Sequence, residues 1–272
     1  MKSSVFISGA TGGLGKAFTV ECASRGWNLF LTDLSADRLA ILANGLQNTY
    51  DVQVRHQHCD LTDLASRSRL FDTLQAEGLR FWALINVAGV DFEGPFSEQS
   101  RQAIRTILRL NIEATLDVTH ELLERTDPAR PFRIITVASL AAFYPMPIKA
   151  TYAASKRFLV DFSLALREEL RGRGATVTVL CPAGMPTTPD CIDGIEVQGL
   201  MGQITTQNIG TVAAKTLDAA LRGRPLVIPG LINQLLQMAG SLVPPIGLAA
   251  LIGKRWQAAY QERTRTAEPA EG

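Results

Sequence analysis

The sequence predicts an α/β protein with a doubly wound parallel sheet, helices on both faces and a C-terminal helical extension. Three observations predict this fold. Short apolar runs alternate with helix-length amphipathic segments, as in repeated βαβ units. The first apolar run, residues 4–7, leads into a glycine-rich turn that opens a helix. The chain has 272 residues, 46% of them apolar, which is enough for one such core. Together these features predict a single doubly wound sheet.

Strands and helices are expected in alternation with short connections. We expect strands over residues 4–7, 27–32, 51–58, 81–85, 133–137, 176–180 and 225–228. We expect helices over residues 13–25, 36–48, 97–123, 152–172 and 210–221. One domain is expected over residues 1–260, with an apolar helical extension at 229–260 and a disordered, charged tail at 261–272.

The glycine-rich turn contains Gly9, Gly13 and Gly15. In a strand–turn–helix arrangement, backbone N–H groups and the positive end of the helix can receive a phosphate. Asp33 follows the second strand, twenty residues after Gly13. A carboxylate there can hydrogen-bond both hydroxyls of an adenosine ribose. The alternative is that these residues bind no ligand and are only a glycine-rich turn beside a surface aspartate.

Tyr152 and Lys156 lie four residues apart at the start of a long amphipathic segment, so they share one helix face. A positive charge ~4 Å from a phenol is worth roughly 4 kcal/mol at an effective dielectric near 20. That interaction would lower the tyrosine pKa from about 10 by ~2–3 units. A phenol in this range can act as a general acid and base. Many solvated helices carry the same spacing, so the pair needs supporting context.

The combined motifs provide that context, because they resemble the short-chain dehydrogenase/reductase family. The order and spacing match over about residues 3–228, at Gly9, Gly13, Gly15, Asp60, Asn86-Val87-Ala88-Gly89, Asn111, Ser139, Tyr152 and Lys156. The resemblance implies a single Rossmann-type domain, a nicotinamide cofactor and hydride transfer between an alcohol and a carbonyl.

The resemblance also implies a role for each site residue. Tyr152 would be the acid–base group, Lys156 would lower its pKa and hold the nicotinamide ribose, Ser139 would fix the reacting oxygen, and Asn111 would support a proton-relay water. The expected cofactor contacts are Gly9, Thr11, Gly13, Leu14, Gly15, Asp33, Asp60, Leu61, Asn86, Ala88, Gly89, Tyr152, Lys156, Pro182, Gly184 and Thr187.

Some positions depart from the family pattern or have a second interpretation. Val87 stands where the family usually has an asparagine, and Ala183 where a glycine commonly follows the proline. Asp60 could contact adenine, as the resemblance implies, or cap the following helix. Asn111 could support the relay or be an ordinary surface residue within a helix.

The cofactor is expected to be NAD rather than NADP. Asp33 would repel the 2′-phosphate of NADP and accept hydrogen bonds from the free ribose hydroxyls of NAD. The family's NADP users place basic residues where Gly12 and Leu34 stand. Arg38 is the side chain that could still reach a phosphate from the next helix.

The substrate is expected to be a lipophilic alcohol or ketone, steroid-, fatty- or aromatic-like. The side chains expected around it are Phe92, Phe143, Tyr144, Met146 and Met185, although such residues often only pack. Residues 188–208 are expected to form a mobile lid over it. Two rival functions are a dinucleotide-sensing regulatory protein and a membrane-surface lipid-handling protein.

Composition narrows the class of protein further. A net charge of +1 without a basic cluster indicates that nucleic acid is not the partner. Four cysteines without a C-x-x-C pair indicate free thiols, and the first strand begins too early for a signal peptide, so we expect a cytoplasmic protein. His56 and His58 beside Cys59 lack further ligands, so no metal site is expected.

Residues 226–253 contain no charged side chain. Prolines and glycines within this segment argue against a continuous membrane-spanning helix. We expect a helix at 231–242, a Pro-Pro turn and a second short helix reaching Tyr260. Such an apolar surface must be covered. Packing against another subunit of a homodimer or homotetramer, with partial closure of the cleft, ranks first, and membrane contact ranks second.

Overall fold

The structure, a computed structural model, describes residues 3–186, 205–254 and 256. Its centre is a sheet with strand order β3-β2-β1-β4-β5-β6-β7, and all neighbouring strands are parallel. This confirms the predicted doubly wound parallel sheet. The strands are β1 (Ser4–Ser8), β2 (Leu29–Asp33), β3 (Val54–His58), β4 (Phe81–Asn86), β5 (Phe132–Val137), β6 (Ala175–Leu180) and β7 (Leu226–Val227).

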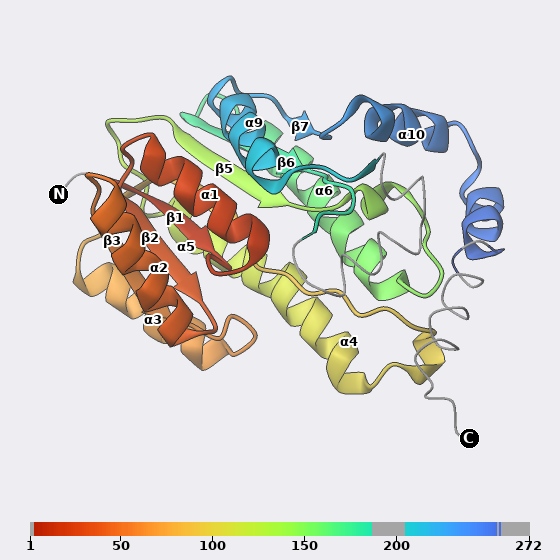
Figure 1. Cartoon of the computed structure of the whole chain (residues 1–272), viewed down its shortest axis with the longest axis horizontal. Helices are drawn as coiled ribbons and strands as arrows, with labels where there is room; N and C mark the ends of the chain where they lie inside the picture. Colours follow the sequence, from red (N-terminus) through yellow and green to blue (C-terminus); the bar gives the residue numbers. More distant parts are fainter. Residues whose placement is uncertain (1–2, 187–204, 255, 257–272) are drawn as a thin grey trace.

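Helices cover both faces of this sheet (Figure 1). One face is covered by α1 (Gly13–Ser24), α2 (Ala36–Thr49) and α9 (Ile209–Leu221). The other is covered by α3 (Leu64–Ala76), α5 (Ala114–Leu123) and α6 (Ala150–Glu169). The remaining elements are η1 (Phe96–Glu98), α4 (Arg101–Ile107), η2 (Leu108–Glu113), η3 (Leu140–Phe143) and α10 (Leu231–Ser241).

The central strands are apolar on both sides because both faces of the sheet are buried. In β1, Val5 and Ile7 point into the core beneath α1, α2 and α9, whereas Phe6 points into the opposite core. The Phe6 ring stacks on Phe30 of β2 at a centroid distance of 5.4 Å. The continuous apolar run of the first strand therefore fills two cores at once.

Two predicted boundaries are corrected by the structure. The third strand begins at Val54 rather than at residue 51, because Asn28 and Gln47 side chains accept the N–H groups of Gln53 and Val54 instead. The long helix expected over 97–123 is divided into η1, α4, the π-helical turn η2 and α5. Ser100 caps the start of α4 by accepting a hydrogen bond from the Ala103 N–H at 3.1 Å.

The apolar C-terminal extension packs against the segment between β5 and α6. Helix α10 lies at one end of the molecule, beyond β7 (Figure 1), and residues 245–254 form a further helical segment. A Cβ on Gly240 would lie 2.5 Å from Cε1 of Tyr144, and one on Gly253 would lie 3.1 Å from Cγ of Pro147. No helix among the described residues is both long and apolar enough to cross a membrane.

Several predictions fall wholly or partly outside the described residues. These are Thr187, most of the expected lid at 188–208, the fourth cysteine Cys191, the end of the second C-terminal helix and the tail at 261–272. The three cysteines that the structure describes, Cys22, Cys59 and Cys181, are buried free thiols.

Candidate active site

The candidate residues gather at the carboxyl ends of the parallel strands. The glycine turn follows β1, Asp33 ends β2, residues 86–94 follow β4, Ser139 follows β5, and residues 181–186 follow β6. In an open parallel sheet, this edge forms the crevice in which ligands bind. The sheet order therefore brings together residues that lie far apart in the sequence.

The glycine turn needs glycine at Gly9 and Gly15 because other backbone lies close to both. Gly9 has φ +65°, and a Cβ there would lie 2.8 Å from the Ala88 backbone. A Cβ on Gly15 would lie 1.9 Å from the Gly9 carbonyl oxygen. Gly13 and Leu14 begin α1, whose first turn carries no acidic side chain. The first N–H groups of a helix have no intrahelical partner, so this turn can receive a phosphate.

Asp33 is held against the glycine turn. Its Oδ2 accepts a hydrogen bond from the Thr11 N–H at 2.8 Å, and its Oδ1 accepts one from the Ser35 N–H at 3.4 Å. Thr11, Lys16 and Arg38 line a hollow of about 440 Å³ between α1 and α2. The turn that Asp33 is bonded to therefore borders a hollow that also contains two cationic side chains.

Asp60 does not cap the following helix. Its Oδ1 accepts hydrogen bonds from the N–H and the hydroxyl of Thr62, at 2.8 and 2.7 Å, whereas Asp63 is the N-cap of α3. The capping alternative for Asp60 is therefore wrong, because the helix starts one turn later. Leu61 is fixed by Arg67, whose Nη1 donates to the Leu61 carbonyl at 2.6 Å.

Sequence reasoning missed Arg67, which is completely buried. It forms ion pairs with Glu113 and with Asp117, the latter at 2.8 Å, and so ties α3 to the helix that contains η2. In a sequence, such an arginine looks like an ordinary charged residue of an amphipathic helix, because its ion-pair partners lie about 50 residues away.

The backbone after β4 lies against β1. The Ser8 hydroxyl accepts hydrogen bonds from the N–H groups of Val87 and Ala88, at 3.2 and 3.4 Å. The Val87 side chain packs against the core, so the departure from the family pattern replaces an amide with an apolar contact. Asn86 donates to Thr119 at 2.9 Å, and its buried Oδ1 has no hydrogen-bond partner within the described part of the chain.

Asn111 lies in the π-helical turn η2 and is completely buried. Its Oδ1 accepts the Val90 N–H at 2.9 Å, and its Nδ2 donates to the Val90 carbonyl at 3.0 Å and to the Ser155 hydroxyl at 3.1 Å. The surface-residue alternative for Asn111 is therefore wrong. π-Helical turns are frequent at functional sites.

Lys156 is buried beside these groups. Its Nζ donates to the Val137 carbonyl at 3.1 Å and lies 5.7 Å from the centroid of the Tyr152 ring. A Cβ on Gly89 would lie 3.1 Å from this Nζ and from Asn111 Oδ1, so only glycine leaves room for both. Burial lowers the pKa of Lys156 to about 8, although the charge of Asp91 acts in the opposite direction.

Ser139 and Tyr152 flank the segment between β5 and α6. Ser139 is the N-cap of η3, and its Oγ accepts the Ala141 N–H at 3.1 Å. Tyr152 lies in the first turn of α6, where its carbonyl accepts a hydrogen bond from the Ser155 hydroxyl at 2.7 Å. A helix cap therefore fixes the backbone at Ser139, and a side-chain hydrogen bond within α6 fixes it at Tyr152.

The segment after β6 approaches the same edge of the sheet. The Pro182 carbonyl accepts a hydrogen bond from the Leu140 N–H at 2.8 Å, next to Ser139. Gly184 is exposed in the irregular stretch that follows, and Thr187 lies beyond the described residues.

A second group of charges, which sequence reasoning also missed, lies beside Tyr152. Lys149 forms ion pairs with Asp91 and with Glu93, the latter at 3.1 Å. Its Nζ lies 5.8 Å from the centroid of the Tyr152 ring. Because 58 residues separate Lys149 from Asp91, these side chains look like ordinary surface charges in the sequence.

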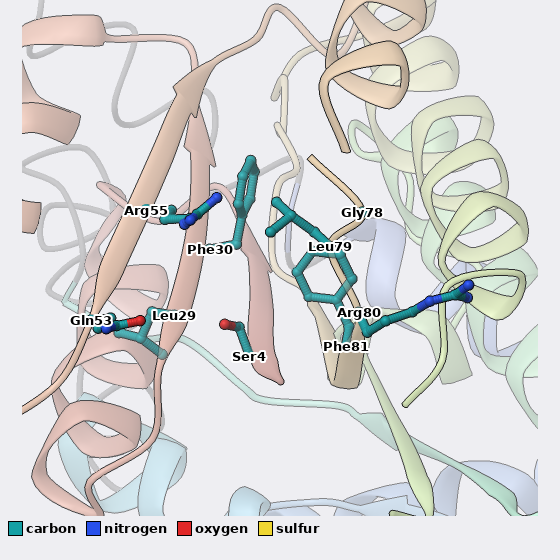
Figure 2. Close-up of a pocket in the computed structure, with 9 residues that line it drawn as sticks. All are labelled: Ser4, Leu29, Phe30, Gln53, Arg55, Gly78, Leu79, Arg80 and Phe81. Atoms are coloured by element: carbon teal, nitrogen blue, oxygen red, sulfur yellow. The ribbon is translucent and has the colours of Figure 1, made fainter. Parts of the chain in front are cut away.

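Figure 2 shows a different cavity, of about 140 Å³, lined by residues such as Ser4, Leu29 and Phe81. These residues begin β1, β2 and β4, so the cavity lies at the amino ends of the strands. It is separate from the candidate site. Within residues 3–186, 205–254 and 256, no three His, Cys, Asp or Glu side chains are grouped so as to hold a metal ion.

Comparison with known proteins identifies the family. A family model described as short chain dehydrogenase matches residues 3–190. The chain belongs to this family. It is 32% identical over 175 residues to a very-long-chain 3-oxoacyl-CoA reductase of Phaeosphaeria nodorum, covering 63% of this chain and 51% of the relative. It is 35% identical over 185 residues to a sulfoacetaldehyde reductase of Chromohalobacter salexigens, covering 67% and 72%.

This short-chain dehydrogenase spans about half the length of the first curated relatives that it matches. Among solved structures, it superimposes on a short-chain dehydrogenase from Sphingobium yanoikuyae in complex with NADPH, with a TM-score of 0.77 and 25% identity. That match covers 99% of this chain and 98% of the other. The shared fold therefore extends beyond the part matched by the family model.

Proposed function

We propose that this short-chain dehydrogenase transfers a hydride between a nicotinamide dinucleotide and the alcohol or carbonyl carbon of a lipophilic substrate. The observation that carries this proposal is the buried Lys156 ammonium, 5.7 Å from the centroid of the Tyr152 ring. A cation so close to a phenol favours the phenolate and makes the tyrosine a usable acid and base near neutral pH.

The residues at the strand ends fit a dinucleotide. Side chains on Gly9 or Gly15 would collide with backbone, so glycine is what lets the turn, α1 and the segment after β4 pack closely. The first N–H groups of α1 are then available to a pyrophosphate. Asp33 is poised beside that turn for a ribose, and the buried Asn86 Oδ1 still lacks a donor within the described residues. When bound, the dinucleotide supplies the hydride donor or acceptor; the protein supplies orientation and proton transfer.

In the oxidative direction, the Tyr152 phenolate takes the hydroxyl proton of the alcohol as its carbinol carbon gives up a hydride. The Ser139 hydroxyl already accepts the Ala141 N–H, which leaves its hydrogen to hold the reacting oxygen. Lys156 stabilises the phenolate, and the proton leaves through a water supported at Asn111. The reductive direction uses the same groups in reverse.

NAD is the proposed cofactor, since the Asp33 carboxylate would face the 2′-phosphate of NADP. Lys16 and Arg38 favour NADP, because these two cationic side chains line the same hollow as Thr11. The carboxylate argument is stronger because a backbone N–H holds Asp33 at the turn, whereas the two cations are on long, exposed side chains.

The lipophilic class of substrate is supported by this chain's own side chains. Phe92 is partly exposed next to Asp91, which pairs with Lys149 beside the Tyr152 ring, and Tyr144 packs against Gly240 of the apolar extension. One relative is named for a very-long-chain acyl substrate and another for the small molecule sulfoacetaldehyde, so the relatives do not agree on a class.

We also propose that the protein is a cytoplasmic homo-oligomer. The outer side of α10 exposes Leu231, Leu235, Met238 and Leu242, at helical spacing, and a second copy of the chain would cover them. Buried free thiols fit a reducing compartment. Light scattering should give a dimer or tetramer that stays in the supernatant when sedimented with liposomes. A monomer that sediments with liposomes would favour membrane contact instead.

The central test is a panel of alcohols and ketones, including steroids, followed at the nicotinamide absorbance with each cofactor. Tyr152→Phe should lower turnover at least by the 10²–10⁴-fold typical of general acid–base catalysis. Its dinucleotide affinity should stay close to wild type, because only a hydroxyl is removed. A Tyr152→Phe protein that keeps a tenth of the activity would refute the assignment.

A further inference from the structure

Lys149 has no role in the mechanism above, although it lies as close to the Tyr152 ring as Lys156 does. It precedes Tyr152 by three residues and Lys156 follows by four, so the three side chains share one face of α6. The Nζ atoms of Lys149 and Lys156 lie 5.8 and 5.7 Å from the centroid of the Tyr152 ring. The candidate acid–base residue therefore has two ammonium groups near it.

The position of Lys149 is an unfavourable one for a cation. Lys149 is the N-cap residue of α6, at the end where the helix dipole repels positive charge, and its side chain does not cap the helix. Two carboxylates from the segment after β4 hold it there, since its Nζ forms ion pairs with Asp91 and with Glu93, the latter at 3.1 Å. Its side chain is only 15% exposed. Lys149 is thus a fixed cation and differs from an ordinary surface lysine.

The backbone beside these ion pairs is also fixed. The Gly94 N–H donates to the Ile148 carbonyl at 2.8 Å. Ile148 has φ +60°, a strained conformation for a β-branched residue that persists only where surrounding contacts enforce it. The segment after β4 therefore holds both the side chain of Lys149 and the residue that precedes it.

The charges beside Tyr152 come from two elements. Lys149 and Lys156 belong to α6 and its N-cap, whereas Asp91 and Glu93 belong to the segment after β4. Asp91 acts on both lysines, because it pairs with Lys149 and its charge also acts on Lys156. Glu93 has a further partner besides Lys149. Removing one cation from this group raises the pKa of a nearby phenol whatever the net charge of the remainder, because each charge acts on the phenolate separately.

The two lysines differ in how firmly they hold their protons. Burial lowers the pKa of Lys156 to about 8, although the charge of Asp91 acts in the opposite direction. The neighbouring thiol of Cys181, whose pKa burial raises to about 12, is neutral at that pH. Burial also lowers the pKa of Lys149, but Asp91 and Glu93 raise it by more. Lys149 therefore stays charged in the pH range in which Lys156 loses its proton.

We propose that Lys149 is a second cation that favours the phenolate of Tyr152. Lys149 acts through Tyr152, so it is a positioning residue, and the inference rests on the proposed function, in which Tyr152 is the acid–base group. A unit charge ~6 Å away shifts a pKa by about 2 units at an effective dielectric near 20. Partial solvent exposure should reduce the contribution of Lys149 to about one unit.

The test measures the pKa of Tyr152 directly, so it needs no substrate. The chain has four tyrosines, and the titration of Tyr152 is the difference in ultraviolet phenolate absorbance between each protein and the same protein carrying Tyr152→Phe. Lys149→Met should raise the Tyr152 pKa by about one unit. Lys149→Arg keeps the charge and should stay close to wild type. Lys215→Met, on α9 at the other face of the sheet, is the control and should leave this pKa unchanged.

A second background removes one compensating effect. Loss of Lys149 frees Asp91 to act on Lys156 alone, and a Lys156 that keeps its proton to higher pH would offset part of the change at Tyr152. The same substitutions are therefore also made in a Lys156→Met protein, in which this compensation is impossible. Lys149→Met should raise the Tyr152 pKa there by at least as much as it does in the wild type.

A purely structural role for Lys149 predicts lower stability with an unchanged Tyr152 pKa in the folded protein. An unchanged pKa in both backgrounds would overturn this inference and leave the proposed function standing. Once a substrate is found, the pH midpoint of kcat/KM for alcohol oxidation should rise in Lys149→Met by the same amount as the pKa, and an unmoved midpoint would also overturn the inference. If no alcohol or ketone is turned over, the proposed function fails, whereas a raised Tyr152 pKa would still support the action of Lys149 on the phenol. If Lys149→Met does not fold, Lys149→Gln supplies the neutral side chain.

Discussion

Replacing Lys156 with methionine should make the protein more stable and nearly inactive. Lys156 is 4% exposed, and burial lowers its pKa from 10.5 to about 8. At pH 7 its ammonium is charged in both the folded and the unfolded chain. Because the folded state binds that proton less tightly, holding the charge costs the folded protein about 3 kcal/mol, at about 1.4 kcal/mol per pKa unit.

The sign of this effect follows from proton linkage. Between pH 8 and 10.5 the unfolded chain binds the proton and the folded chain does not, so wild-type stability rises with pH across this range. Methionine removes the charge but also the hydrogen bond to the Val137 carbonyl, worth about 1 kcal/mol. Lys156→Met should therefore be about 2 kcal/mol more stable than wild type at pH 7 in the absence of dinucleotide, and lose this advantage above about pH 10.

Activity should move in the opposite direction. Unit charges separated by about 6 Å interact by roughly 3 kcal/mol at an effective dielectric near 20, which is a factor of about 100 in the phenolate population of Tyr152. Denaturant unfolding at pH 7 and pH 10, together with turnover at pH 7, measures both effects. A stability gain that is the same at both pH values would refute the electrostatic reasoning, since packing alone would then explain it. A loss of stability at pH 7 would refute it outright.

Three further substitutions test the cofactor site and the proton relay. Asp33→Ala should shift the ratio of kcat/KM for NAD over NADP toward NADP by at least about tenfold, since it removes the repelling carboxylate; equal values for the two cofactors in the wild type would contradict the NAD preference. Gly15→Ala should reduce dinucleotide affinity at least ~100-fold or prevent folding, because its Cβ would lie 1.9 Å from the Gly9 oxygen, which must then move away from the phosphate site. Gly12→Ala is its control, with the nearest atom at 3.6 Å, and should bind like wild type. Asn111→Leu leaves the N–H and C=O of Val90 unpaired, so the free energy of unfolding should fall by ~2–4 kcal/mol. Turnover should also be lost. Unchanged turnover would show that Asn111 is not part of the relay.

The fold could be predicted from the sequence because its signals are local. Apolar runs alternate with amphipathic segments because both faces of the sheet are buried. This pattern can be recognised from residues that are neighbours in the sequence. Gly9 and Gly15 could be identified for a similar reason, since any side chain there would collide with backbone. The start of α2 was also placed correctly, at the residue after its cap Ser35.

The remaining features depend on pairs that lie far apart in the chain. Lys149 contacts Asp91 across 58 residues, and Arg67 contacts Asp117 across 50, so neither contact could be inferred from spacing. Asn111 was expected in an ordinary helix because its bonds to Val90 become visible only when η2 lies beside the segment after β4. Tertiary hydrogen bonds here override the local preference for a regular helix.

The π-helical turn at Leu108–Glu113 constrains how this protein can change by mutation. A turn with hydrogen bonds to the fifth residue holds one residue more than a regular turn, so α4 and α5 are out of phase by about the 100° that one residue contributes. No substitution removes this phase difference. Deleting one residue of α4 would restore a continuous helix and rotate Asn111 away from the backbone that it now holds. Only an insertion or deletion of one codon converts this helix into a regular one. The length of this segment is therefore as important to the position of Asn111 as the choice of asparagine at that position.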